Sequence, residues 1–265
     1  MIKLFLSASA VRTVRETPVA GVPAVTHPLW ADVFPWLVQG TTIREALSAT
    51  GPGAPFDMGM FSGGTQPERV LANWTRLGDG LALPGFTHAP QVHGCDVEWH
   101  TQGGPGVRMV PACDGHATST PGAALAVTVA DCVPVFVVDP VHRAIALLHA
   151  GWRGAASGIL ARGLRRLEDE ASTAAGDVHL HLGPSICGAC YEVGPEVFAA
   201  LGLDPPPGPA PLDLRRVVAA QALGEGVDLD RITVSEWCTL CGDSPFFSHR
   251  GGDRSRQIAY MGITR

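Results

Sequence analysis

Three short segments of the sequence each offer a side chain that can bind a metal ion. QVHG contributes His93, ADC contributes Cys132 and HAGW contributes His149. Two imidazole rings and one thiolate form a suitable ligand set for zinc, and three protein ligands leave a fourth position for water or substrate. The three residues are far apart in the sequence, so their spacing alone does not bring them together. The alternative to a metal site is that Cys132 is an ordinary buried cysteine and that the two histidines bind no metal.

Two CxxC pairs account for four of the other cysteines. CGAC contains Cys187 and Cys190, and CTLC contains Cys238 and Cys241. A structural zinc site with four cysteines normally has this two-pair form, although the usual knuckle glycines and a short intervening loop are missing here. The alternative is a set of unpaired cysteines that pack in the core or near another site. A thioredoxin-like redox motif is less favoured because no βαβ context surrounds CGAC, and the odd total of seven cysteines does not suggest a disulfide framework.

Two glycine-rich segments have residue types that suit an anion. GPSICGACYEVG (183–194) follows a predicted strand and can offer backbone N–H groups, while SHRGGDRSR (248–256) combines arginines with glycines. The alternative for 183–194 is a glycine-rich connection without a ligand, and the alternative for 248–256 is a solvated loop. Two familiar motifs are missing from the sequence: it has no HxE followed by PCxxC, as in zinc-dependent nucleobase deaminases, and no GxGxxG that opens a helix after the first strand.

The hydrophobic pattern predicts the elements that position these residues. Continuous apolar runs predict strands over 122–131, 133–140 and 144–150, which end beside or contain Cys132 and His149. The stretch 88–100, with His93, is also interpreted as a strand. Further strands are predicted over 33–43, 178–184, 231–237 and 257–263, and helices over 67–77, 155–170 and 211–223. Because the order does not repeat βαβ, we predict an α+β fold: one compact domain over residues 1–265, with a central mixed β-sheet flanked by helices.

The composition is that of a globular protein. Hydrophobic residues make up 46% of the 265 residues and charged residues 17%. The formal net charge of −6 gives no general attraction to nucleic acid or to an anionic membrane. The initial MIKLFLSASAVRTVRE breaks its apolar run too early for a secretory signal, and no stretch approaches the ~18 uninterrupted apolar residues of a membrane helix. We therefore expect a cytoplasmic protein with neither nucleic acid nor membrane as partner, while its oligomeric state is not indicated.

Taken together, the segments QVHG, ADCVPV, HAGWRG, GPSI…CYEVG and CT…FFSHR resemble the YfiH-type family. Its members were formerly described as multicopper polyphenol oxidases or laccase-like proteins and are now understood as zinc-containing purine nucleoside phosphorylases. The resemblance runs from about Trp36 to the C-terminus. It implies an α+β fold with a compact mixed sheet, and Zn²⁺ bound by His93, Cys132 and His149. It further implies phosphorolysis of adenosine, inosine, guanosine and S-methyl-5′-thioadenosine, with some adenosine deamination.

Phosphorolysis needs a phosphate held beside C1′ of the ribose while the departing purine gains a proton or a hydrogen bond. We expect Arg153 and Arg250 to hold phosphate or substrate. Trp152 or Phe247 is expected to stack on the base. Asp131, beside a metal ligand, is expected to orient that ligand or to relay a proton, with a cap at the strand end as the alternative.

The segment FDMGMFSGGTQPERVLANW (56–74) departs from the family pattern. Trp74 stands where the family's helix ends in an arginine, Asp57 replaces an asparagine, and Phe61 stands near the position of a histidine. A basic group that the family places by the substrate is therefore missing, and Arg44 in QGTTIR can take over its role.

Three other functions are alternatives to phosphorolysis. Editing of peptidoglycan precursors, also associated with the family, would remove a misincorporated amino acid from a muramyl nucleotide by hydrolysis, with Cys132 as a nucleophile; zinc on Cys132 would argue against it. A non-catalytic binding scaffold stabilised by zinc would have a closed fourth coordination position. An oxidase of the laccase type requires several copper sites, which a single set of two histidines and one cysteine does not provide.

Overall fold

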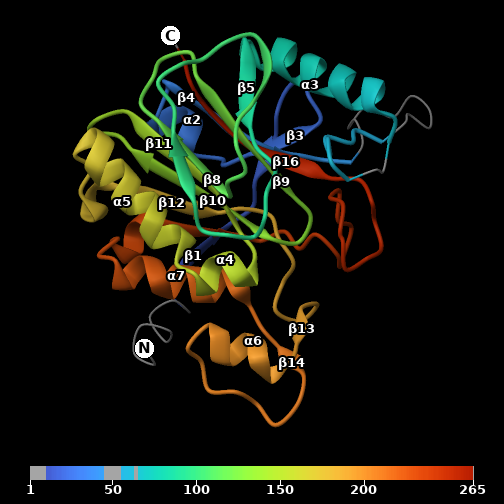
Figure 1. Cartoon of the computed structure of the whole chain (residues 1–265), viewed down its shortest axis with the longest axis vertical. Helices are drawn as coiled ribbons and strands as arrows, with labels where there is room; N and C mark the ends of the chain where they lie inside the picture. Colours follow the sequence, from blue (N-terminus) through green and yellow to red (C-terminus); the bar gives the residue numbers. More distant parts are fainter. Residues whose placement is uncertain (1–9, 45–54, 63–64, 265) are drawn as a thin grey trace.

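The computed structural model describes residues 10–44, 55–62 and 65–264. Within these residues, most strands belong to two seven-stranded mixed sheets (Figure 1). In spatial order, the first sheet contains β1 (Arg12–Val14), β15 (Ile232–Ser235), β12 (His179–Leu182), β10 (Val133–Asp139), β11 (Ala144–Ala150), β8 (Gly115–Thr118) and β6 (Val97–Trp99). The second contains β2 (Thr17–Pro18), β3 (Ala24–Thr26), β4 (Leu37–Thr42), β16 (Gln257–Ile263), β9 (Ala124–Val129), β5 (Gly85–His88) and β7 (Gly106–Met109).

Helices and one short strand pair complete the fold. The helices are α2 (Trp30–Val33), α3 (Pro67–Leu81), α4 (Trp152–Ala156), α5 (Ile159–Ala171), α6 (Pro195–Ala200) and α7 (Leu214–Gly224). Strands β13 (Glu192–Val193) and β14 (Ala210–Pro211) pair with each other and, with α6, project at the bottom of Figure 1. Among the described residues, no helix has the length and apolar character needed to cross a membrane.

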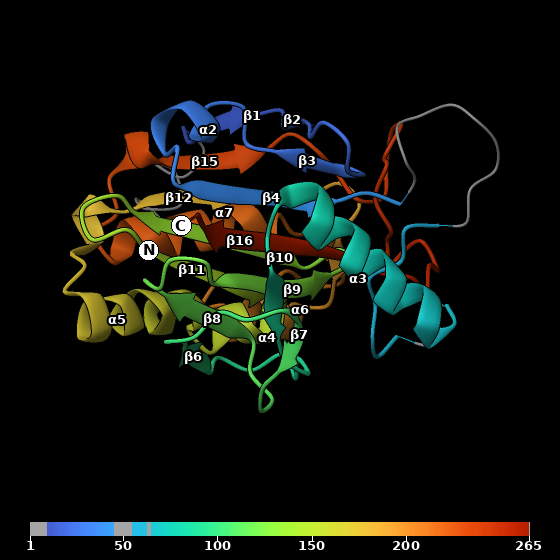
Figure 2. The ribbon, with the colours of Figure 1, turned by 90° about the horizontal axis from the view of Figure 1, so that it is seen from above.

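The two sheets pack face to face between outer layers of helices. The core between the sheets combines residues of β9 and β16 with residues of β10 and β11, including Leu125, Met261, Phe136 and Leu147. Helices α5 and α7 cover the outer face of the first sheet, whereas α3 covers the outer face of the second. Figure 1 shows α3 on the opposite side of the sheets from α5 and α7, and Figure 2 shows α3 from above, in front of the end of β16. The burial of β9, β10 and β11 explains their continuous apolar runs.

The predicted α+β fold with mixed β structure flanked by helices is confirmed, and its strands are divided between two sheets. The expected domain range 1–265 and the N-terminal segment extend into residues 1–9, 45–54, 63–64 and 265, which lie outside the described part of the chain.

Two predicted elements differ from the structure. The strand expected over 88–100 is wrong: β5 ends at His88, β6 begins at Val97, and a loop lies between them. Pro90 lacks the N–H that a strand ladder needs, and His93 has a φ of 59°, in the left-handed region. The helix expected over 155–170 is instead two helices, α4 and α5, because Gly158 between them has a φ of 81°.

The chain crosses between the two sheets at two places that concern the candidate ligands. Residues 130–132 connect β9 of the second sheet to β10 of the first, and Cys132 is the last residue of this link. The loop after β5 of the second sheet leads to β6 of the first and carries His93. The two crossings bring Cys132 and His93 side by side, with Sγ and Nε2 4.0 Å apart. The site therefore forms where the chain passes from the second sheet to the first.

Candidate metal and substrate site

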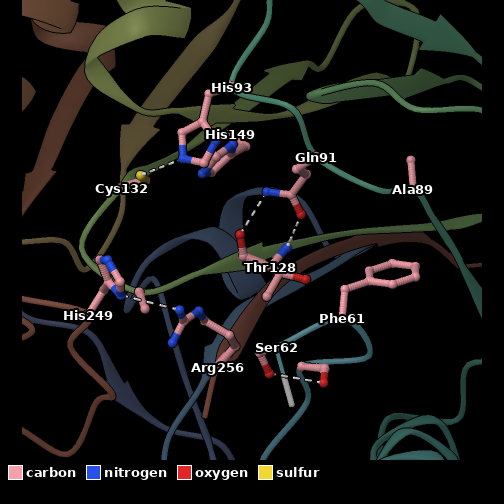
Figure 3. A pocket seen from close by; sticks show the side chains of 12 residues that line it. Phe61, Ser62, Ala89, Gln91, His93, Thr128, Cys132, His149, His249 and Arg256 are labelled. Carbon is pink, nitrogen blue, oxygen red and sulfur yellow. Dashed lines mark hydrogen bonds between the residues drawn. The ribbon is translucent and has the colours of Figure 1, made fainter. Parts of the chain in front are cut away.

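His93, Cys132 and His149 come together on one side of a cavity (Figure 3). One ligand atom from each residue lies within 4.8 Å of the other two. The rings of His93 and His149 stand edge to face, with their centroids 4.9 Å apart. His149 is buried, Cys132 is half-buried and His93 is exposed, so the cluster has a protein side and an open side. The three residues singled out in the sequence thus form a compact donor set of the kind that binds zinc.

A carboxylate behind the cluster orients His149. Oδ1 of Asp114 lies 2.8 Å from Nδ1 of His149, and both side chains are almost fully buried. Since a carboxylate accepts a hydrogen bond, Nδ1 carries the proton and Nε2 is left with a free lone pair. This arrangement of carboxylate, histidine and metal site is a common way to fix the tautomer and orientation of a histidine ligand.

The same carboxylate also holds the loop that carries His93. Asp114 accepts backbone N–H bonds from Val92, His93 and Gly94, at 3.0, 2.9 and 2.8 Å. These bonds satisfy the backbone of a loop in which His93 adopts its left-handed conformation. Asp114 therefore positions two of the three candidate ligands.

Asp114 was missed in the sequence analysis. Its segment, CDGH (113–116), has an acid directly before a short strand. An isolated acid beside a turn glycine is ordinary in surface loops, so the available signal was weak.

The charges of the metal-free cluster favour a thiolate. Burial raises the pKa of Cys132, but the neighbouring His149 and His93 more than offset this effect and lower it to about 6. Burial likewise lowers the pKa of His149, but Cys132 and Asp114 raise it to about 9. The thiolate is the form of cysteine that binds metals.

The cavity beside the cluster has a volume of about 410 Å³, which is within the range of small-molecule sites. Figure 3 shows the cluster on one side of it, Phe61 on another, and Arg256 with His249 on a third. Its lining residues are Gly59, Phe61, Ser62, Ala89, Gln91, His93, Thr128, Ala130, Cys132, His149, His249 and Arg256.

Three lining residues that were not selected from the sequence have suitable chemistry. The ring of Phe61 is 64% exposed and is stacked on His88, with centroids 6.1 Å apart. Arg256 is held by the carbonyls of Asp253 and Ser255, each 2.9 Å from Nη1, and donates from Nη2 to Nδ1 of His249 over 3.4 Å. Its guanidinium therefore faces the cavity in a fixed place. The arginine-rich segment 248–256 was the available signal for Arg256, but it gave no reason to choose among its arginines.

Trp152, Arg153 and Arg250 do not line this cavity. Trp152 begins α4 and packs against the core under the helices, and the Arg153 guanidinium lies 4.3 Å from the centre of the Trp152 ring. Arg250 donates from Nη1 to the carbonyl of Glu192, 3.0 Å away, and its guanidinium lies over the Tyr191 ring. Arg153 and Arg250 are therefore not part of the cavity wall, and their expected role as a phosphate clamp stays a prediction.

Asp131 is engaged in holding a loop. Its carboxylate accepts a hydrogen bond from the Thr239 hydroxyl (2.6 Å) and another from the backbone N–H of Arg250 (2.7 Å). Asp131 has a φ of 84°, and these two bonds help to stabilise that conformation. The expected ligand-orienting contact is made by Asp114 instead.

Phe247 and Arg44 also lie away from the cavity. Phe247 is buried, with its backbone N–H and carbonyl both bonded to the side chain of Gln257. Arg44 pairs with Asp253 at 2.8 Å and donates to the carbonyl of Phe246. A buried ring cannot stack on a substrate base, and the Arg44 guanidinium is already paired.

Trp74, which stands at the position of the family's arginine, belongs to the core. It is 2% exposed, packs edge to face on Phe86, and donates from Nε1 to the carbonyl of Met58 over 3.0 Å. This bond holds the segment that leads to Phe61. Arg256 is the arginine that the structure places at the cavity in this region.

Comparisons with known proteins identify the family and the fold of this chain. A family model described as "Multi-copper polyphenol oxidoreductase laccase" matches residues 38–264. A relative from Geobacillus stearothermophilus named "Purine nucleoside phosphorylase YlmD" is 34% identical over 253 residues, which cover 88% of this chain and 92% of the relative. The crystal structure of YlmD from the same organism superimposes with a TM-score of 0.84 at 32% identity, covering 94% of this chain and 99% of that one. The crystal structure of YfiH from Bacillus licheniformis, a hypothetical protein, gives 0.83 at 26% identity, with 93% and 98% covered.

Proposed function

We propose that this chain, which belongs to the multi-copper polyphenol oxidoreductase laccase family, is a zinc-containing purine nucleoside phosphorylase. Its expected substrates are adenosine, inosine, guanosine and S-methyl-5′-thioadenosine, each with phosphate. The observation that carries the proposal is one cavity that brings together a His₂Cys cluster, an arginine and an exposed aromatic ring. These are the groups that a metal ion, a phosphate and a purine base require.

Arg256 is the group best placed to hold phosphate. Two backbone carbonyls fix its guanidinium at the cavity wall, and a guanidinium can donate two parallel hydrogen bonds to phosphate oxygens. Holding phosphate and nucleoside in one cavity turns an encounter of two molecules into a reaction within one complex, which is worth up to about 7–11 kcal/mol of the barrier in well-oriented systems.

Phe61 is the group best placed to stack on the purine. Its ring is exposed at the cavity and rests on the buried His88 ring, which supports it from behind. His249, which lines the same wall as Arg256, offers a ring nitrogen that can exchange a proton with the reacting groups.

The donor set fits a zinc ion. His93, Cys132 and His149 have ligand atoms within 4.8 Å of one another, Asp114 leaves Nε2 of His149 free, and the cluster opens on the cavity. When bound there, zinc would polarise an oxygen of phosphate or substrate, or lower the pKa of a water molecule and so support adenosine deamination. One His₂Cys set does not match the several copper sites implied by the family's description.

The test is to incubate the purified protein with adenosine in the presence and absence of phosphate and to identify the products. Ribose 1-phosphate and adenine, formed only with phosphate, are expected. Substitution His149→Ala should abolish turnover, whereas His142→Ala, which removes an exposed histidine that does not line the cavity, should not. If inosine is the sole product and forms in the absence of phosphate, the proposed activity is deamination and not phosphorolysis.

Two further outcomes would support the other functions. Absence of nucleoside turnover together with hydrolysis of an aminoacyl muramyl nucleotide, dependent on Cys132 and not on metal, would indicate peptidoglycan editing. Absence of any turnover in protein that holds zinc would indicate a binding scaffold.

A further inference from the structure

The two CxxC pairs lie together at one edge of the first sheet. Cys187 and Cys190 follow β12, and Cys238 and Cys241 follow β15. Because β12 and β15 are parallel neighbours, the segments that leave their C-terminal ends start side by side, and residue 185 forms a parallel bridge with Cys238. The long interval between the pairs in the sequence is therefore closed by the sheet.

The four sulfur atoms are spaced as the ligands of one metal ion would be. All four lie within 4.8 Å of one another, and the Sγ atoms of Cys187 and Cys241 are 3.8 Å apart. Four sulfurs bound to one zinc ion at about 2.3 Å in a tetrahedron are separated by about 3.8 Å. All four cysteines are free in the structure, and a disulfide would require a separation of about 2.05 Å.

Backbone groups already surround one of these sulfurs. Sγ of the buried Cys238 accepts N–H bonds from Cys187 (3.3 Å), Leu240 (3.3 Å) and Cys241 (3.5 Å). The donors to this sulfur therefore come both from its own CxxC segment and from the other CxxC pair. Outer donors of this kind orient a metal ligand and are part of a preformed metal site.

A buried arginine fixes the approach to this second pair. Nη1 of Arg215 donates to the carbonyls of Ser235 (3.0 Å) and Trp237 (3.2 Å), the residues just before Cys238. The guanidinium is charged and buried, and Asp213 pairs with it at 3.2 Å. This contact places Cys238 independently of any bound ion.

We propose that Cys187, Cys190, Cys238 and Cys241 form a second metal site, a structural Zn²⁺ site with four thiolate ligands. Four protein ligands leave no open position, which is the arrangement of structural sites and not of catalytic ones. The close spacing of the sulfurs suits a single ion. This inference uses no residue of the cavity and is independent of the proposed phosphorylase activity.

The ion would join two loops to the link that carries Cys132. The backbone N–H of Ile186, beside Cys187, donates to the carbonyl of Asp131 over 3.1 Å. The hydroxyl of Thr239, beside Cys238, donates to the Asp131 carboxylate over 2.6 Å. Each CxxC pair thus has a direct neighbour that contacts Asp131. The second site would hold in place the segment immediately before a ligand of the first.

The test uses Co²⁺ as a spectroscopic substitute for zinc in the full-length Cys132→Ala protein. This substitution removes the cavity's thiolate, so any sulfur-to-cobalt charge-transfer absorption must come from other cysteines. We expect one Co²⁺ per chain to give that absorption together with the visible bands of a tetrahedral thiolate site. One equivalent of Zn²⁺ should then remove both.

Matched variants locate the signal. In the Cys132→Ala background, adding Cys241→Ser, at an exposed position, or Cys238→Ala should abolish the tetrathiolate spectrum. Adding Cys95→Ala should leave it unchanged. Circular dichroism of each variant distinguishes a lost ligand from a lost fold, and the exposed Cys241 provides the variant that is least disruptive to packing.

Several results would overturn the proposal. The first is that the Cys132→Ala protein shows no thiolate–cobalt absorption. The second is that the spectrum persists in folded Cys238→Ala and Cys241→Ser variants. The third is that the metal found in the purified protein is iron.

Discussion

Asp114 and His149 are joined by two hydrogen bonds, one through their side chains and one through their backbones. Oδ1 of Asp114 lies 2.8 Å from Nδ1 of His149, and the backbone N–H of His149 donates to the carbonyl of Asp114 over 2.7 Å. The remaining capacity of the carboxylate is used by the backbone of the His93 loop. A single buried acid thus holds one candidate ligand in position and stabilises the conformation of the segment that presents another.

Asp114→Asn is expected to weaken metal binding at the His93, Cys132 and His149 site. The amide nitrogen can accept none of the N–H bonds that the carboxylate now accepts, so the His93 loop loses a partner. We expect metal affinity to fall about 10- to 100-fold, as measured by competition with a chromogenic chelator. Asp96→Asn, which removes the same charge from an exposed position in the same loop, serves as the control. Equal affinities of both variants would contradict the assignment.

Arg256→Ala is expected to raise the KM for phosphate more than the KM for nucleoside. Removing a charge-assisted hydrogen-bond donor typically costs about 1.5–3 kcal/mol, which corresponds to a change of about 10- to 160-fold in kcat/KM for phosphate. Arg250→Ala removes an arginine of the same segment that lies outside the cavity and should change the phosphate dependence little. A larger effect at Arg250 would place the phosphate elsewhere.

Phe61→Ala is expected to raise the KM for nucleoside and to leave the KM for phosphate nearly unchanged. Stacking of a base on an aromatic ring contributes about 1–3 kcal/mol, so an increase of about 5- to 160-fold is expected. Phe61→Trp keeps an aromatic face and should retain most of the affinity. The result that would refute stacking is an equal loss in both variants, measured from initial rates with adenosine as substrate.

The sequence pointed to the cluster of His93, Cys132 and His149 because all three are tied to strong local patterns. Cys132 and His149 lie at or beside the ends of continuous apolar strands, and QVHG with HAGWRG carries the family resemblance. The cavity residues that we propose to hold substrate were not predictable in the same way. Phe61 and Arg256 lie in irregular segments of different regions of the chain, and only the packing of α3 and β16 brings them to one cavity.

In the segment HAGWRG, His149 lines the cavity, whereas its sequence neighbours Trp152 and Arg153 do not. His149 is the penultimate residue of β11, and the chain then turns at Gly151 into α4. Trp152 and Arg153 therefore belong to helix α4, while His149 belongs to the cluster with His93 and Cys132. A compact motif suggested one combined binding surface, but the change from strand to helix separates its side chains.

Buried neutral histidines predict a loss of stability at mildly acidic pH. Burial lowers the pKa of His88 and of His100 to about 4. Burial, together with the nearby His181, lowers that of His27 to about 3. Below pH 6.5 the unfolded chain binds protons at these positions that the folded chain does not. Stability present above pH 6.5 is therefore lost as the pH falls toward 4, by at most about 1.4 kcal/mol per pH unit for each histidine.

His88→Gln tests one of these contributions directly. Nδ1 of His88 donates to the carbonyl of Ala126, and Nε2 accepts from the Thr128 hydroxyl; a glutamine amide also provides a donor and an acceptor but does not titrate. Urea unfolding between pH 7 and pH 4.5 should show a smaller decline of the unfolding free energy in the variant, whatever its absolute stability. Parallel declines in both proteins would show that His88 is already accessible to protons in the folded state.

Gly151→Ala is expected to disturb the metal site without straining the backbone. Gly151 has a φ of −75°, which alanine adopts readily, but a Cβ there would lie 2.9 Å from Cδ2 of His93 and 3.2 Å from Sγ of Cys132. Both side chains would have to move away from the position they share with His149. We expect metal affinity to fall about tenfold or more, as for other changes that displace ligands, with little change in circular dichroism. Gly208→Ala, where a Cβ meets no atom within 4 Å, should bind metal like the unchanged protein, and equal affinities of the two variants would show that the cluster accommodates the methyl group.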